Sequence, residues 1–264
     1  MNLMKKRWIL LIVACTINLC AGSIYAWSVF APPLAERLSL LTGEALTAGS
    51  LAAAFSLANA VGPIPMILGG AVNDRFGPRW VIASGGLLIG LGFFLAATAE
   101  TTLSLILGYG IGFGLGLGLV YGSTINTTLK FFPDHRGLAG GLTTALYGLS
   151  SVILPPVALA LISAEGIQYA LIMLGTVFTV MIVSGGLFMQ KCPDGFEAKF
   201  RSSTAAPVRP AREELNWRGM LRARRFPPMV LLLLCGAIPG MMIISHCWSA
   251  ARELAGLDAA AASV

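Results

Sequence analysis

Polar side chains that can donate hydrogen bonds recur at helical spacing inside the most apolar stretches of the sequence. Asn18 and Tyr25 fall on one face of a helix, and Thr144, Tyr147 and Ser151 fall on one face of another. A tyrosine hydroxyl donates a hydrogen bond without the roughly 2.5–3.5 kcal/mol that a charged side chain costs at the centre of a membrane helix. Such residues could therefore donate hydrogen bonds to a ligand inside the membrane, and helix packing is the alternative role of the tyrosines.

Residues that usually carry covalent, acid–base or metal chemistry are few and scattered. His135 lies in a basic loop, His246 stands alone in an apolar run, and the odd set of five cysteines contains no pair with CxxC spacing. The glycine-rich residues 108–122 contain fragments like GxGxxG, but a nucleotide-binding loop needs a preceding strand and a following soluble helix. The sequence therefore predicts no enzyme active site, no cofactor and no metal site.

The elements that carry these residues are long and apolar. The 264 residues are 56% hydrophobic and 11% charged, whereas ordinary soluble proteins are about 25% charged. The charges cluster in short segments and leave runs long enough to cross a hydrocarbon core of about 30 Å as helices. This pattern excludes a soluble globular protein and predicts an all-α polytopic membrane protein with spans at residues 8–30, 45–71, 80–99, 103–129, 138–163, 167–190 and 229–250.

The distribution of lysine and arginine predicts the orientation of these spans. With the N-terminus in the cytoplasm, every lysine and arginine except Arg37 and Arg252 falls on the cytoplasmic side. The net charge of +6 is then a consequence of topology, with anionic lipid headgroups as its neighbours, and a nucleic-acid partner is disfavoured. A cleaved signal peptide is the weaker interpretation of the N-terminus, because the apolar run continues to Phe30.

A long polar segment divides the predicted spans. We expect a bundle of six helices over residues 1–190, a basic cytoplasmic central loop over residues 191–228, and a seventh helix over residues 229–264 that begins an incomplete second bundle. This is the layout of transporters built from two six-helix bundles. The chain is therefore expected to be truncated.

Glycine occupies every second position of the fourth predicted span from residue 108 to residue 118. Small residues at helical spacing let the backbones of membrane helices approach closely. We expect this span to touch neighbouring helices on two sides, through one face with glycine at positions 110, 114 and 118 and a second face with glycine at positions 108, 112 and 116. Contact between the glycine backbone and a substrate is the alternative interpretation.

The loop between the second and third predicted spans carries a recognisable motif. Residues 69–79 read GGAVNDRFGPR, which resembles the signature loop of the major facilitator superfamily in the same position. The resemblance implies that Asp74 and Arg75 form a latch with the second half of the protein, which holds the cytoplasmic gate shut. Gly77 would allow the turn of the loop, and Arg79 would support the latch.

Motifs in the first, fourth and fifth spans give a narrower resemblance. Residues 25–30 read YAWSVF and residues 130–139 read KFFPDHRGLA, which resembles the oxalate/formate antiporter and monocarboxylate transporter branch of that superfamily. In this branch, tyrosines of helices 1, 4 and 5 line the path of the anion. The matching positions are Tyr25, Tyr121 and Tyr147, and Asn18 lies on the same predicted helix face as Tyr25.

The resemblance implies a secondary transporter of small organic carboxylate anions that works by alternating access in the plasma (inner) membrane. Its activity would be either oxalate/formate exchange or transport of a monocarboxylate such as lactate. The expected partners are the anion, the lipid bilayer, and either a missing C-terminal half or another copy of the chain, without which the chain would be inactive. A seven-span receptor or sensor is the alternative from another class, and the loop signature argues against it.

Overall fold

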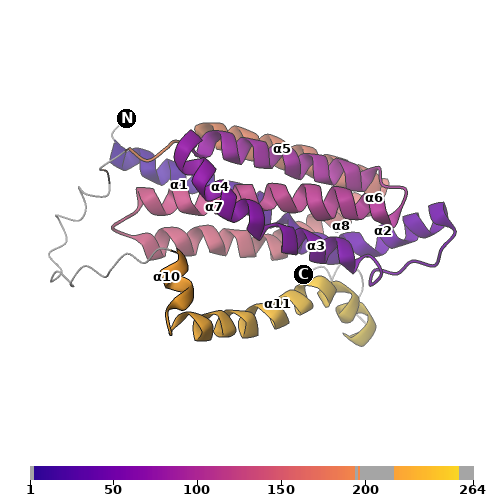
Figure 1. The fold of residues 1–264 in the computed structure, drawn as a ribbon. Coiled ribbons are helices and arrows are strands. Elements are labelled where there is room, and N and C mark those ends of the chain that lie inside the picture. Colours follow the sequence, from indigo (N-terminus) through magenta and orange to yellow (C-terminus); the bar gives the residue numbers. More distant parts are fainter. Residues whose placement is uncertain (1–2, 194–195, 197–216, 256–264) are drawn as a thin grey trace.

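The computed structural model describes residues 3–193, 196 and 217–255, and the long elements in these ranges are helices that lie side by side (Figure 1). Within the described residues, five helical stretches are apolar and long enough to cross a membrane. Helices that are apolar on all sides are what a lipid-embedded bundle requires. The five stretches are Lys6–Thr42, Ala52–Gly70, Pro78–Ala97, Thr102–Phe131 and Arg136–Phe188.

The first span consists of three consecutive helical segments. They are the α-helix α1 (Leu3–Ala21), the 3-10 helix η1 (Gly22–Ala26) and the α-helix α2 (Trp27–Thr42). The expected end at residue 30 was wrong, because α2 continues to Thr42 with two prolines inside it. They are the sixth and seventh residues of α2, so each removes one intrahelical hydrogen bond, a loss that membrane helices tolerate where neighbouring groups bond the freed carbonyl oxygens.

The second span is interrupted at its centre. Helix α3 (Ala52–Val61) ends before Gly62, and helix α4 (Pro63–Phe76) begins with a proline at its first position. Gly62 keeps helical backbone angles and its N–H donates a hydrogen bond to the Ala58 carbonyl oxygen at 3.3 Å, so the interruption lies in the hydrogen bond that Pro63 cannot donate. The predicted start at residue 45 was too early, since residues 43–51 precede α3 as a connecting segment of turns and bends.

The third and fourth spans pack tightly against each other. The third is helix α5 (Pro78–Ala97), and the fourth comprises α6 (Thr102–Leu105), the π-helical segment η2 (Ile106–Phe113) and α7 (Gly114–Phe131).

The glycines of the fourth span confirm the expected contact on two sides. A Cβ atom on Gly114 would lie 2.6 Å from the Ala58 carbonyl oxygen on α3, and one on Gly116 would lie 2.6 Å from the Gly85 carbonyl oxygen on α5. Real Cβ atoms do not come this close to backbone atoms. Only glycine at these two positions lets the fourth span contact α3 and α5 at this distance.

The fifth and sixth predicted spans are two helices joined end to end, and together they carry the label α8 (Arg136–Phe188, 53 residues). A straight helix of that length would extend roughly 80 Å, more than twice the thickness of a hydrocarbon core. Gly166 interrupts it with φ of +84° and ψ of 171°, a backbone conformation that is essentially restricted to glycine. The chain reverses there, as the sequence predicts between residues 163 and 167.

Contacts between distant segments define two ends of the bundle. At one end the Arg37 guanidinium donates a hydrogen bond to the Ala99 carbonyl oxygen at 3.0 Å. At the other end the Lys6 ammonium donates one to the Gln190 side chain at 2.6 Å. The two ends of the first span are therefore each held by a segment that lies far away in the sequence.

The last described elements lie along one side of the bundle. They are the short helix α10 (Trp217–Arg222) and the helix α11 (Phe226–Ala255), which touches α2 (Figure 1). The backbone of α11 covers the seventh predicted span, and its apolar part, Phe226–Gly240, is shorter than the spans of the bundle. Large apolar side chains on α11, such as Leu232 and Leu233, are exposed. This helix therefore has little of its surface buried against the rest of the chain.

Candidate functional site

Three tyrosine side chains from three separate segments meet in the bundle. Tyr25 lies in η1, Tyr121 in α7 and Tyr147 in the first part of α8. The ring centroids of Tyr25 and Tyr147 are 5.2 Å apart, and those of Tyr121 and Tyr147 are 4.6 Å apart. All three residues are partly exposed, so the tyrosine cluster borders accessible space.

A close contact between the first span and α8 positions this cluster. The Ser150 hydroxyl donates a hydrogen bond to the Gly22 carbonyl oxygen at 2.8 Å. A Cβ atom on Gly22 would lie only 2.7 Å from the Ser150 Cβ, so this approach requires glycine. Tyr25 follows Gly22 by three residues, and side chains at this spacing eclipse each other in a 3-10 helix. The segment η1 therefore turns Tyr25 toward α8 and Tyr147.

Asn18 is more deeply buried than the three tyrosines. Its side chain is fully buried, and its amide nitrogen donates to the Ala14 carbonyl oxygen at 2.9 Å. The side-chain oxygen of Asn18 has no hydrogen-bond partner among the described residues.

A strip of small residues on α8 borders the tyrosine cluster, and sequence reasoning found its Thr144 and Ser151 but missed its two glycines. Gly141 and Gly148 have no atom within 4 Å of the position that a Cβ would take, and Thr144 between them is exposed. These residues share one helical face with Ser151, which lies three positions further along. The alternation of glycine and hydroxyl residues at three- and four-residue spacing is the signal that could have found this strip.

The loop between α4 and α5 is compact, and its basic side chains are exposed. Gly77 adopts φ of +86° and ψ of 160°, which only glycine tolerates without strain. Arg75 and Arg79 are exposed, and the Arg75 guanidinium lies 5.4 Å from the Phe76 ring centroid. The side chain of Asp74 lies outside the described part of the chain. Asn73 beside it is buried, and its side-chain oxygen has no partner among the described residues.

A buried ion pair near this end of the bundle was also missed. The Arg7 Nη1 atom lies 2.8 Å and 2.9 Å from the two carboxylate oxygens of Asp134, in the loop between α7 and α8. The Phe132 ring centroid lies 4.9 Å from the Arg7 guanidinium, and Trp8 packs edge-on against Phe132 at 5.1 Å. Sequence reasoning assigned Arg7 to membrane topology alone. The aromatic and acidic residues of the segment 130–139 were the available signal.

The described residues hold no group of three or more His, Cys, Asp or Glu side chains placed to bind a metal ion. The polar groups that the bundle brings together are hydroxyls, and these can donate hydrogen bonds to an anion without carrying charge. The tyrosine cluster and the small-residue strip on α8 therefore suit the binding of a small anionic group rather than metal or acid–base chemistry.

Comparison with known proteins decides the family. The sequence profile of the Major Facilitator Superfamily matches residues 6–264 of the chain. This chain belongs to the major facilitator superfamily. Members of this superfamily are multi-pass membrane proteins, in agreement with the five apolar helical stretches of the described residues.

Curated members of the major facilitator superfamily resemble the chain over much of its length. An uncharacterized MFS-type transporter, YhjX, of Escherichia coli is 26% identical over 99% of this chain and 62% of its own. The oxalate:formate antiporter of Oxalobacter formigenes is 30% identical over 69% of this chain and 42% of its own. Human monocarboxylate transporter 11 is 32% identical over 69% of this chain and 38% of its own. The chain thus spans roughly two fifths to three fifths of the length of these relatives.

Proposed function

We propose that this chain forms the N-terminal part of a secondary transporter for small organic carboxylate anions. The observation that carries the proposal is the tyrosine cluster, in which Tyr25, Tyr121 and Tyr147 converge from three spans and border accessible space. Two of the relatives are an oxalate:formate antiporter and a monocarboxylate transporter, which supports a carboxylate as the substrate. Oxalate, formate and lactate are therefore the first candidates.

The tyrosine hydroxyls would replace part of the hydration of the carboxylate as it crosses the membrane. A hydrogen bond to a charged group contributes about 1.5–3 kcal/mol. Gly141 and Gly148 leave room beside Tyr147 for the anion to pass. Asn18, which is buried in the same span as Tyr25, would be the fourth residue of this path.

Alternating access would then move this bundle against a second one. In this proposal residues 1–190 form the first bundle, residues 191–228 the central loop, and residues 229–264 the beginning of the second bundle. The second bundle would come from a C-terminal half or from another copy of the chain. Asp74, Arg75, Gly77 and Arg79 would form a latch that joins the two bundles at the cytoplasmic side, with the N-terminus in the cytoplasm and the protein in the plasma (inner) membrane.

Uptake of labelled anions tests the proposed function. The chain is reconstituted in liposomes, alone and together with the part of YhjX that lies beyond the aligned region, and exchange of oxalate, formate and lactate is measured. We expect Tyr147→Phe to lower the rate at limiting substrate about tenfold or more, because one hydrogen bond to the charged anion is lost.

The chain offers a matched control for this experiment. Tyr169 lies in the second part of α8, is 47% exposed and belongs to no aromatic pair of the tyrosine cluster. Tyr169→Phe should leave the rate within twofold of the unmodified chain. Equal effects of the two substitutions would contradict a substrate path through Tyr147, and the absence of saturable exchange with any of the three anions would contradict the substrate class.

A further inference from the structure

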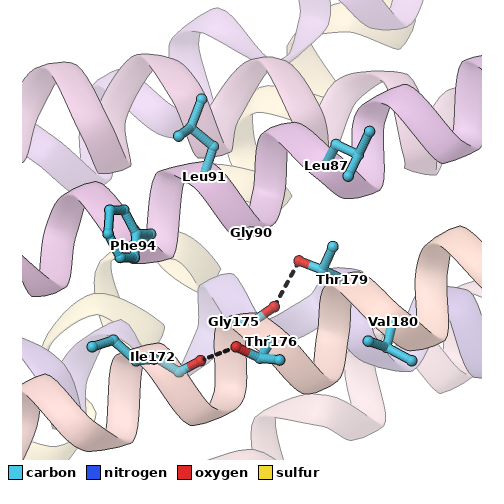
Figure 2. Close-up of a pocket in the computed structure, with 9 residues that line it drawn as sticks. All are labelled: Leu87, Gly90, Leu91, Phe94, Ile172, Gly175, Thr176, Thr179 and Val180. Carbon is cyan, nitrogen blue, oxygen red and sulfur yellow. Dashed lines mark hydrogen bonds between the residues drawn. The ribbon is translucent and has the colours of Figure 1, made fainter.

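A groove on the outside of the bundle lies between the third and sixth spans. It has a volume of about 350 Å³ and is lined by residues of α5 and of the second part of α8 (Figure 2). The lining residues on α5 are Leu87, Gly90, Leu91 and Phe94, and those on α8 are Ile172, Gly175, Thr176, Thr179 and Val180.

Close packing of the two helices forms the floor of this groove. A Cβ atom on Gly175 would lie 2.6 Å from the Phe93 Cβ, and a Cβ atom on Gly90 would collide with the Thr179 hydroxyl. The two helix backbones therefore meet at the glycines. The larger side chains, such as Leu87 and Phe94, are exposed and form the walls of the groove on either side of this glycine contact.

The groove is apolar, because its two hydroxyl groups are already bonded. The Thr176 hydroxyl donates to the Ile172 carbonyl oxygen at 2.7 Å, and the Thr179 hydroxyl donates to the Gly175 carbonyl oxygen at 2.7 Å (Figure 2). The groove carries no charged side chain. The threonine hydroxyls therefore have no free hydrogen to donate to a ligand. A ligand that fills the groove must be apolar.

The dimensions of the groove select among apolar occupants. It extends over eight residues of α5, from Leu87 to Phe94, which is roughly 10 Å at the rise of a helix. The groove is open along its outer side, where the hydrocarbon of the bilayer surrounds the bundle. A slender hydrocarbon chain can lie along such a short hollow and touch both walls, whereas a helix about 10–12 Å wide could insert only single side chains.

The depth of the groove in the membrane agrees with one lipid leaflet. Leu87 lies roughly 14 Å along α5 from its beginning at Pro78, and Phe94 lies about 5 Å before its end at Ala97. In a hydrocarbon core of about 30 Å the groove therefore runs from the midplane toward the interface at the Ala97 end.

We propose that this α5–α8 groove binds one acyl chain of a membrane phospholipid from the leaflet on the Ala97 side. The bound acyl chain lies over the contact of the two helices at Gly90 and Gly175. There it makes van der Waals contacts with groove side chains that the two helices do not cover. This site is independent of the proposed transport function, because it lies on α5 and the second part of α8, away from the tyrosine cluster.

Photolabelling tests this site on the full chain. The purified protein is placed in nanodiscs that contain a small fraction of phosphatidylglycerol or phosphatidylcholine with a diazirine near the end of one acyl chain, and the labelled peptides are mapped. We expect saturable labelling of residues 87–94 and 172–180 with either headgroup. Thr176→Phe should reduce it at least fivefold by filling the groove, whereas Val177→Phe, at an exposed neighbouring position outside the lining, should change it less than twofold.

Two further variants keep the test decisive. Thr176→Val keeps the volume and removes the hydroxyl, so labelling should persist. Leu91→Trp narrows the groove from the other helix and should reduce labelling even if Thr176→Phe does not fold, with folding followed by thermal unfolding in detergent. Labelling that rises linearly with lipid and equals that of residues 231–238 would overturn the proposal. Labelling confined to one headgroup would overturn an acyl-chain site, and cross-links between two copies through Leu91→Cys would identify a protein interface instead.

Discussion

At the scale of single residues, Arg7 near the start of the first helix is a charged side chain that the bundle buries. The Arg7 side chain is 6% exposed and that of Asp134 is 19% exposed, so water screens the pair only weakly. An aromatic ring faces the same guanidinium. A buried charge whose partner is removed loses its compensation, and this loss exceeds the net stabilisation that the intact pair provides.

Removing either partner of this pair should destabilise the bundle. We expect Asp134→Asn or Arg7→Met to lower the free energy of unfolding in detergent by about 2–3 kcal/mol, because each removes the opposite charge that lies 2.8 Å from the remaining one. The double variant should lose less than the sum of the two. Arg222→Met, at an exposed position, should change stability by less than about 0.5 kcal/mol. Additive losses in the double variant would show that the two residues act separately.

Two glycines with positive φ should respond differently to substitution. Gly77, at φ of +86° and ψ of 160°, adopts a conformation closed to other residues, while Gly43, at φ of +74° and ψ of 5°, is in the left-handed region that asparagine also visits. We expect Gly77→Asn to lower the free energy of unfolding by about 1–3 kcal/mol and Gly43→Asn by less than about 1 kcal/mol. Equal losses in chemical unfolding would contradict this ranking.

At the scale of elements, the fourth span is the helix against which α3 and α5 pack closely through glycine. It contacts α3 and α5 through two glycine faces, which is the arrangement that its alternating sequence predicts. In lipid the hydrophobic effect does not drive helices together, so close van der Waals contact must do so. Adding one methyl group at such a contact therefore acts on the main source of stability.

A pair of glycine-to-alanine variants isolates this effect. Gly116→Ala places a Cβ 2.6 Å from the Gly85 carbonyl oxygen, whereas Gly141→Ala places one in open space. The first should lower the free energy of unfolding by about 1–3 kcal/mol through overpacking. The second should raise it by up to about 1 kcal/mol, since alanine favours a helix more than glycine does. Comparable thermal unfolding of the two variants would argue against close glycine contact as a source of stability.

The sequence predicts the apolar spans well, because each is a long run bounded by charge or by glycine. It does not predict the 3-10 segment η1 or the π-helical segment η2, since a change in hydrogen-bond register leaves no trace in composition. That limit reaches the candidate site directly. The family resemblance implies that Tyr25, Tyr121 and Tyr147 share a function, but the geometry that brings Tyr25 against Tyr147 depends on η1, which the sequence does not predict.

At the scale of the whole molecule, the two ends of the bundle differ in charge. Arg7 and Arg79 lie at the end that carries Lys6 and Gln190, and Arg37 lies at the other. An excess of lysine and arginine marks the cytoplasmic side of membrane proteins. The end with Arg7 is therefore expected in the cytoplasm.

Cysteine labelling in intact cells measures this orientation. In a background without native cysteines, Glu44→Cys should react with an impermeant maleimide added outside, and Arg79→Cys should react only after permeabilisation. Both native residues are exposed, so access through the membrane decides the result. The reverse pattern would invert the proposed topology.

The long-range contacts of the first helix have a consequence for how the protein is made. Arg7 meets a residue 127 positions later, and Lys6 meets one 184 positions later. A ribosome that adds about 5–20 residues per second needs roughly 6–25 s to add the 127 residues that separate Arg7 from Asp134. During that interval the first helix has been made but Asp134 has not. We expect insertion factors that shield polar helices to matter most for this protein before its fifth span emerges.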